Sequence, residues 1–189
     1  MEKAVSQQHR ESGDQEGGKK FLPLAYVGKI CDQAPVICFD GRAYRYEGGV
    51  YAQWYPEEID QQIIQLYWPE VQTSHLHSVR EFLTSVCFQR SEKVNPRGLL
   101  NLQNGLLSMQ AGDFEPHSPD ILSTVQSQTS FRPKDECPLW LRTVKEIQPN
   151  NEARLLLAQI FGYCLTPDNS HQKGFILHGD GANGKSLVK

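Results

Sequence analysis

The chain of 189 residues lacks any pattern that would direct it into or across a membrane. No apolar run approaches the roughly eighteen residues that a membrane-spanning helix needs. The first twenty residues are polar and hold no apolar core of the kind that a signal peptide carries. We therefore predict no membrane partner and a protein that stays in the cytoplasm, where it is made.

Paired cysteines are missing as well. The five cysteines form an odd, scattered set without a Cys-x-x-Cys pair: Cys31, Cys38, Cys87, Cys137 and Cys164. This spacing favours a reducing compartment and argues against a disulfide framework or a structural zinc site. We expect most of these cysteines to be small core residues. His75 and His77 would point to different faces of a helix, which argues against a metal-binding pair.

An excess of positive charge is also missing, since the formal net charge is -3. Dedicated nucleic-acid-binding domains usually have a basic balance or a clustered basic face. Any DNA contact must therefore be local or come from other sequence. The content of 39% hydrophobic and 22% charged residues is typical of a soluble globular protein with one good core or two small ones.

Residues 1–20 have almost no apolar content and are predicted to be a flexible tail. Three short strands are then predicted at 36–39, 42–46 and 50–54, with turns at Asp40-Gly41 and Gly48-Gly49. This meander carries aromatic residues beside two arginines, a mixture that could stack on and neutralise single-stranded nucleic acid. The alternative is that the aromatic side chains pack, as they often do in strands. The residues concerned are Arg42, Tyr44, Arg45, Tyr46, Tyr51, Trp54 and Tyr55.

Helices and one hairpin complete an α+β fold. A helix is predicted from Pro56 to Tyr67, where Pro69 ends it, and a second from Ser78 to Phe88. Asn104-Gly105 between two apolar runs predicts a hairpin of 99–102 and 106–109. After an extended, proline-containing connection, two more helices are predicted at 138–147 and 152–164, the last capped by Asn150 or Asn151. A domain boundary is placed near 134, giving a domain at 21–134 and a second at 135–189.

The strongest motif lies near the C-terminus of the sequence. An apolar run, Phe175-Ile176-Leu177, predicts a strand that leads into a Gly-x-x-x-x-Gly-Lys-Ser pattern, the phosphate-binding P-loop or Walker A motif. The cofactor-binding residues predicted by this pattern are Gly179, Asp180, Gly181, Ala182, Asn183, Gly184, Lys185 and Ser186.

Each part of the P-loop motif has a physical role. The glycines allow successive amide N–H groups to turn inward around phosphate oxygens as an anion-binding nest. Lys185 is expected to reach the β and γ phosphates, and the Ser186 hydroxyl to complete the coordination of Mg²⁺. ATP and Mg²⁺ are therefore the predicted cofactors, with Ser186 as the metal contact through ATP.

The C-terminal ninety residues resemble the phage and plasmid primase-helicase family, whose helicase belongs to superfamily 3, with poxvirus primase-helicases as more distant relatives. The resemblance rests on Asn104-Gly105-Leu106-Leu107, Gly112 with Pro116-His117-Ser118-Pro119, Cys137-Pro138-Leu139-Trp140, 161–167 and the P-loop. Two positions depart from the family pattern. Ser108 stands where an acidic residue is frequent, and Phe131-Arg132-Pro133 where Tyr-Asp-Pro or Tyr-Asn-Pro is frequent. Residues 21–91 match only loosely.

The resemblance implies the N-terminal part of an ATP-dependent DNA helicase of phage or plasmid replication. It implies a hexameric ring on single-stranded or forked DNA, in the cytoplasm of a bacterial or phage-infected cell. The chain would then end in the first strand and P-loop of an AAA+-like ATPase core, truncated after the Walker A loop. Because the Walker B acid, the sensor and the arginine finger have no positions here, no catalytic set is complete. We expect the chain alone not to hydrolyse ATP.

Two other functions compete with this interpretation. A nucleotide or shikimate-type kinase also uses a P-loop, but such enzymes usually place it near the N-terminus. A non-catalytic DNA-binding or oligomerisation module would instead use the C-terminal helices for subunit contacts and the meander for DNA or a partner. Primase chemistry is disfavoured because no cluster of paired carboxylates or zinc ligands stands out.

Overall fold

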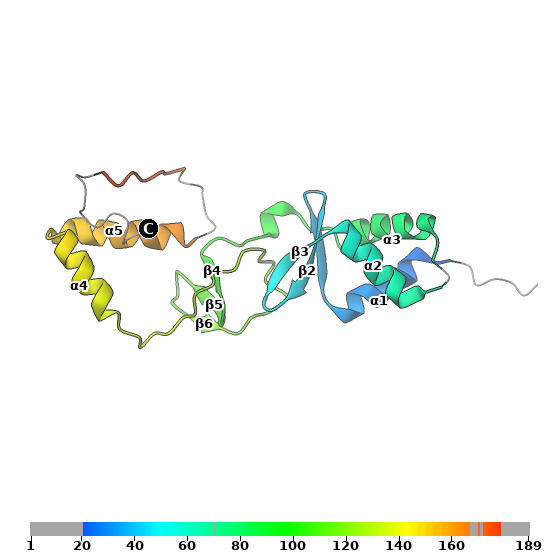
Figure 1. Cartoon of the computed structure of the whole chain (residues 1–189), viewed down its shortest axis with the longest axis horizontal. Coiled ribbons are helices and arrows are strands. Elements are labelled where there is room, and N and C mark those ends of the chain that lie inside the picture. The colour runs from blue at the N-terminus through cyan, green and yellow to red at the C-terminus, as the bar shows by residue number, and fades with distance from the viewer. Residues whose placement is uncertain (1–20, 70, 167–169, 171, 179–189) are drawn as a thin grey trace, which may run out of the picture.

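The computed structural model describes residues 21–69, 71–166, 170 and 172–178. The described elements are α1 (Pro23–Gln33), β1 (Val36–Phe39), β2 (Arg42–Glu47), β3 (Val50–Trp54), α2 (Pro56–Tyr67), α3 (Thr73–Val86), a 3-10 turn η1 (Ser91–Lys93), β4 (Leu99–Leu102), β5 (Gly105–Ser108), β6 (Phe114–Glu115), α4 (Pro138–Ile147) and α5 (Asn151–Cys164). The fold is α+β, as predicted, with two small antiparallel sheets. In Figure 1, helices α1–α3 lie at one end, the two sheets between, and α4 and α5 at the other end.

The first sheet has the order β1-β2-β3 and confirms the predicted meander, with Val36 opposite Arg45 and Tyr46 opposite Tyr51. Its outer edge continues past β1. The Cys38 N–H donates to the Cys87 carbonyl, and the Gln89 N–H donates to the Cys38 carbonyl, each at 2.8 Å. Residues 87–89 therefore add a short parallel bridge that fixes the end of α3 against β1.

The main core lies between this sheet and helices α1–α3. Ile63 and Val79 have no exposed surface, and Ile30 and Leu83 are 1% exposed. They share one apolar cluster with Val27, Cys38, Trp54, Ile59 and Cys87. At the rim of this core, Arg80 Nη1 donates to Asp60 Oδ2 at 2.7 Å, which joins α3 to α2. Arg80 thus has a structural partner in α2.

Helix α1 was not predicted, and α3 begins five residues before the predicted start at Ser78. Pro23 occupies the first turn of α1, where its missing N–H costs nothing, and Val27 and Ile30 face the core. At the start of α3, the Gln72 N–H donates to His75 Nδ1 at 3.3 Å in a capping box. The start of α1 therefore depends on Pro23 and on burial, whereas the start of α3 depends on the capping contact.

The second sheet has the order β4-β5-β6. The Asn104-Gly105 turn joins β4 to β5 as predicted, whereas β6 was not predicted. Helices α4 and α5 also match their predicted positions. Asn150 is the cap of α5, and its Oδ1 accepts hydrogen bonds from the Glu152 and Ala153 N–H groups at 2.8 and 3.1 Å.

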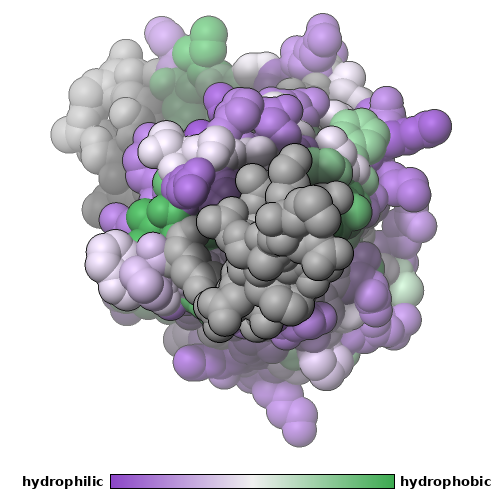
Figure 2. Space-filling view, turned by 90° about the vertical axis from the view of Figure 1, so that its right-hand side faces the viewer, coloured by the Kyte–Doolittle hydropathy of each residue, from purple (hydrophilic) through white to green (hydrophobic). Residues whose placement is uncertain are grey.

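Helices α4 and α5 bury few side chains. The Trp140 and Phe161 rings meet edge to face with centroids 5.9 Å apart, and Val144 is buried. By contrast, Leu139, Leu141 and Leu155 are each more than 60% exposed. At the opposite end of the molecule, the visible surface is mainly hydrophilic with separate hydrophobic patches (Figure 2).

Two buried thiols in the main core predict a loss of stability at alkaline pH. Burial, and secondarily Cys31, raises the pKa of Cys38 from 9.0 to about 11. Burial, followed by contacts with Cys31 and Cys38, raises the pKa of Cys87 to about 12. Below pH 9 these thiols are protonated in both the folded and the unfolded chain. Between pH 9 and the pKa of each thiol in the folded chain, the unfolded chain loses the proton first, so the free energy of unfolding falls by at most about 1.4 kcal/mol per pH unit for each thiol.

Urea unfolding with a reductant between pH 8 and pH 11 measures this loss. Replacing Cys87→Ala removes the share of the pH dependence that Cys87 supplies. The exposed Cys137 provides the matched control, because Cys137→Ala leaves the pH dependence unchanged. A Cys87→Ala protein with the wild-type pH dependence would contradict the assignment.

Candidate functional site

The predicted P-loop residues 179–186 lie outside the described residues, so their predicted contacts with ATP and Mg²⁺ stay predictions. The described segment nearest to them is 172–178. In it, the Phe175 ring packs edge to face on Tyr163 of α5, with centroids 5.9 Å apart. The predicted strand at Phe175-Ile176-Leu177 is not formed as a strand, because no described segment pairs with its backbone.

Most aromatic residues of the meander are packed. Tyr51 is 2% and Trp54 7% exposed, and Phe39 stacks on Tyr44 with ring centroids 4.6 Å apart. Tyr55, at the cap of α2, is exposed. The structure therefore favours the packing interpretation for Tyr51 and Trp54, since a base cannot stack on a ring that is already covered.

A polar groove of about 440 Å³ lies between the meander and α2. Arg45 of β2 lies over the Trp54 ring, 5.5 Å from its centroid, and its Nη1 donates to Gln62 Oε1 at 3.0 Å. Glu47 and Glu58 line the same groove. The charged side chains that line the groove therefore carry a net negative charge. This charge does not favour binding of the phosphate backbone of a nucleic acid.

A buried polar junction connects the two sheets. Asn101 of β4 is 6% exposed, and its Nδ2 donates to the Gly49 carbonyl, in the β2–β3 turn, at 2.9 Å. Gln126 Nε2 lies 3.2 Å from Asn101 Oδ1 and 3.3 Å from the Gly48 carbonyl. His117 Nε2 lies 2.8 Å from the Leu102 carbonyl. The junction consists of side-chain amides and an imidazole bonded to backbone groups of both sheets.

Gly49 allows this close approach. Its φ is +90°, and a Cβ at this position would lie 2.4 Å from His117 Nδ1. Nearby, the Tyr51 hydroxyl donates to the Pro119 carbonyl at 2.7 Å, and the Tyr51 N–H donates to the Ser123 carbonyl at 2.8 Å. Burial, with smaller effects of Tyr46 and Asp120, raises the pKa of Tyr51 and keeps its hydroxyl a donor. The segment Pro116-His117-Ser118-Pro119, which carries part of the family resemblance, thus packs against the first sheet.

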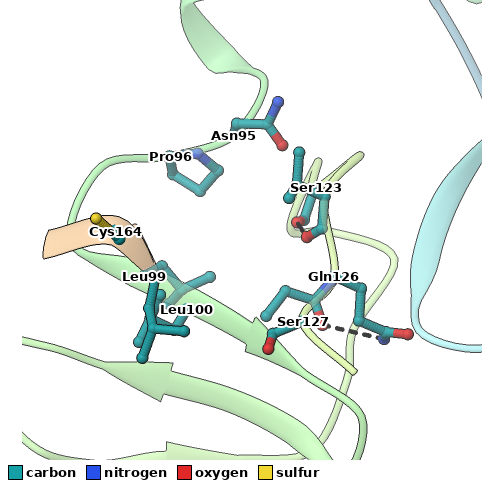
Figure 3. A pocket seen from close by; sticks show the side chains of 11 residues that line it. Asn95, Pro96, Leu99, Leu100, Ser123, Gln126, Ser127 and Cys164 are labelled. Atoms are coloured by element: carbon teal, nitrogen blue, oxygen red, sulfur yellow. Dashed lines mark hydrogen bonds between the residues drawn. The ribbon is translucent and has the colours of Figure 1, made fainter. Parts of the chain in front are cut away.

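A pocket of about 220 Å³ lies beside the junction, between β4, the 123–127 segment and the end of α5. Figure 3 shows Leu99 and Leu100 on one side, Ser123 and Ser127 on the other, and Cys164 at its rim. No group of three or more His, Cys, Asp or Glu among the described residues could hold a metal ion. The pocket is thus a small, partly apolar gap between the second sheet and α5.

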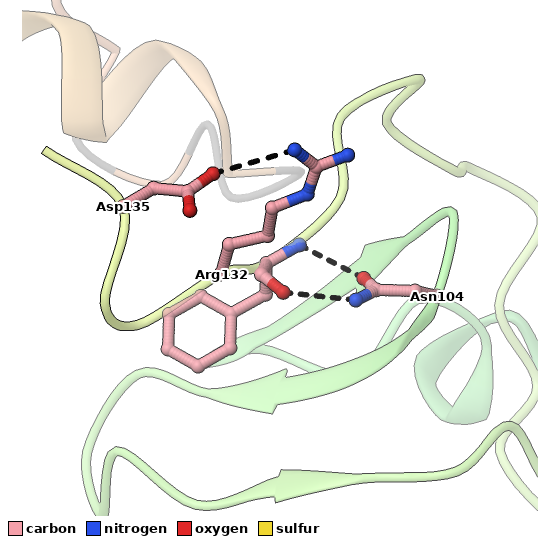
Figure 4. A network of polar contacts seen from close by, with 4 residues as sticks. Asn104, Arg132 and Asp135 are labelled. Atoms are coloured by element: carbon pink, nitrogen blue, oxygen red, sulfur yellow. Dashed lines mark hydrogen bonds and ion pairs between the residues drawn. The ribbon is translucent and has the colours of Figure 1, made fainter. Parts of the chain in front are cut away.

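The Asn-Gly turn has a second role besides closing the hairpin. Asn104 Oδ1 accepts from the Phe131 N–H at 2.8 Å, and its Nδ2 donates to the Phe131 carbonyl at 2.9 Å (Figure 4). Arg132 next to it pairs with Asp135 at 3.4 Å, and the Phe131 ring contacts Phe114 of β6. Phe131-Arg132-Pro133, where the sequence departs from the family pattern, is therefore a segment held by hydrogen bonds to the turn.

Comparison with known proteins identifies this central region. Residues 72–149, which run from the cap of α3 through α4, match the protein-family model described as "D5 N terminal like". This stretch of the chain is therefore similar to a D5 N-terminal-like domain. The polar junction residues Asn101, His117 and Gln126 and the Asn104 turn all lie inside this match.

One relative among the curated proteins is a protein of Acanthamoeba polyphaga mimivirus named "Putative helicase L207/L206". It is 29% identical to this chain over 94 residues, which cover 48% of this chain and 10% of the relative. The chain thus matches about a tenth of that relative's length. Together with the domain match, this supports a helicase- or primase-associated N-terminal region.

These findings support the resemblance to primase-helicases at the level of a helicase- or primase-associated N-terminal region. ATP binding, a phage or plasmid origin and the position of the chain's end relative to an ATPase core stay predictions. No helix in the described part of the chain is both long and apolar enough to cross a membrane.

Proposed function

We propose that this chain is the N-terminal region of an ATP-dependent DNA helicase of phage or plasmid replication and that residues 179–186 bind ATP with Mg²⁺. The observation that carries the proposal is the order of two features in one chain. A D5 N-terminal-like domain at 72–149 precedes a complete Gly-x-x-x-x-Gly-Lys-Ser pattern. A P-loop pattern alone occurs in many protein classes. The domain match upstream of it and the relative named a putative helicase support the helicase class among them.

The chemistry of the loop gives each residue a separate role. The glycine amides would cradle the phosphates, Lys185 would neutralise the β and γ phosphates, and the Ser186 hydroxyl would bind the metal. Hydrolysis requires in addition an acidic metal ligand, a positioned water and a stabilising cation. We therefore propose ATP binding for residues 179–186, and DNA and further subunits are the proposed partners of the assembled helicase.

Lys185→Ala tests the ATP site. We expect binding of a fluorescent ATP analogue with Mg²⁺, measured by anisotropy, to weaken tenfold to a hundredfold, because a charge-assisted hydrogen bond contributes roughly 1.5–3 kcal/mol. Lys173→Ala is the matched control, since Lys173 is exposed and lies upstream of the loop. Ser186→Ala should weaken binding of the nucleotide in the presence of Mg²⁺ more than it weakens binding of the nucleotide without Mg²⁺. Equal binding by the wild type and Lys185→Ala, or no binding by either, would contradict the proposal.

A non-catalytic oligomerisation or DNA-binding module is the second candidate. The observation that favours it is the exposure of Leu141 and Leu155, which line one groove between α4 and α5, since clustered exposed apolar side chains often mark a protein contact. Sedimentation with and without ATP separates the two functions. Nucleotide-dependent assembly supports the helicase region, whereas assembly indifferent to nucleotide supports the module.

A further inference from the structure

Three cysteines, from α1, β1 and the end of α3, meet at the main core. Cys31 lies near the end of α1, Cys38 in β1, and Cys87 is the C-cap residue of α3. Cys38 and Cys87 are buried, and Cys31 is half-buried. None of them is explained by the proposed nucleotide site, and a reducing compartment leaves all three as free thiols.

One pair within this group is close. The sulfur atoms of Cys31 and Cys87 are 3.5 Å apart, whereas the Cys38 sulfur donates to the Leu83 carbonyl at 3.8 Å. A disulfide has a sulfur–sulfur distance of about 2.05 Å, so the two sulfurs must approach by roughly 1.5 Å. Rotation about the Cα–Cβ bonds of two small side chains supplies a movement of this size. The geometry therefore singles out Cys31 and Cys87 among the three thiols.

We propose that Cys31 and Cys87 form a reversible disulfide that ties α1 to the end of α3 when the chain meets a small organic disulfide such as oxidised glutathione. The bond would join positions 56 residues apart. It would also fix the segment 87–89 that pairs with β1, at the point where the D5 N-terminal-like domain meets the first sheet. The redox state would thereby set the rigidity of the contact between the N-terminal helix and this domain.

The exposures give the two thiols different roles in the exchange. Cys31, the more accessible one, attacks the glutathione disulfide as a thiolate, forms a mixed disulfide and releases one glutathione thiolate. Cys87 is 8% exposed, and burial keeps it protonated in the reduced protein. It then gives its proton to solvent and attacks the Cys31 sulfur, which releases the second glutathione thiolate. In total, two protein thiols are oxidised to one disulfide, and one glutathione disulfide is reduced to two thiols.

The test is disulfide mapping of the whole chain after equilibration with oxidised glutathione. Free thiols are blocked, the protein is digested without reductant, and linked peptides are identified by mass spectrometry. We expect a 31–87 linkage and a thermal midpoint raised by several degrees, because the bond restricts the unfolded chain. Both effects should disappear after reduction. The exposed Cys137 and Cys164 report ordinary surface glutathionylation in the same sample.

Variants separate this pair from its neighbour. Cys38→Ser should retain the 31–87 linkage and its thermal shift, whereas Cys31→Ser should lose both. If a variant fails to fold, the mapping of the wild-type chain still decides the question. A linkage of Cys38 with either neighbour, or glutathione adducts without a 31–87 linkage, would overturn the proposal.

Discussion

Replacing Gly105→Ala should lower the free energy of unfolding by about 3 kcal/mol or more, since overpacking and backbone strain add at this position. Gly105 opens β5 with φ +153°. A Cβ there would lie 2.5 Å from the Glu115 backbone oxygen and 2.7 Å from the Phe114 ring. Because a backbone oxygen cannot rotate away, β6 would have to separate from β5.

Gly112→Ala is the matched control for this prediction. Gly112 has φ +75° and lies in the loop between β5 and β6, but nothing stands within 4 Å of the added Cβ. Only the conformational cost of about 1 kcal/mol should remain. Urea unfolding followed by circular dichroism measures both variants. Equal losses for the two would mean that the contact with Glu115 does not restrict this turn.

Leu83→Ala should lower the free energy of unfolding by about 2–5 kcal/mol. Leu83 is 1% exposed and packs in the cluster where α1, α2 and α3 meet. Truncation removes apolar contacts and leaves a cavity that three packed helices cannot fill completely. Since folded domains are stable by only about 5–15 kcal/mol, a large share of the stability would be lost.

The neighbouring residue provides a strict comparison. Phe82 precedes Leu83 in α3 and has a larger side chain, but it is 41% exposed. Phe82→Ala should therefore cost less than about 1 kcal/mol, because surface positions tolerate truncation. Thermal and urea unfolding of both variants give the comparison. A larger loss for Phe82→Ala than for Leu83→Ala would place the core on the other face of α3.

The parts of the fold that the sequence predicted are those with strong local signals. Glycine turns, Pro56 with the acidic residues after it, and Asn104-Gly105 each restrict the backbone within a few residues, and the meander, α2 and the β4–β5 hairpin follow. Helix α1 carries Pro23 and the i, i+3 pair Val27 and Ile30, a signal that could have revealed it. Strand β6 has two residues and exists only because β5 pairs with it.

The polar junction could not be predicted in the same way. Asn101, His117 and Gln126 look like ordinary surface residues in the sequence, and their partners include backbone carbonyls of distant turns. A hydrogen bond to a backbone carbonyl does not restrict the side chain of the residue that supplies the carbonyl, so it leaves no pattern in the sequence. The P-loop is the opposite case. Its pattern is complete in the sequence, and its contacts stay predictions.

The junction also bears on the order of folding. Each sheet is closed by short turns, whereas the bond from Asn101 to Gly49 spans 52 residues and that from Gln126 to Gly48 spans 78. Closing loops of this length costs more chain entropy than forming a hairpin, so the hairpins should form first. The two sheets would then meet as preformed units, and the junction amides would join them in a late step.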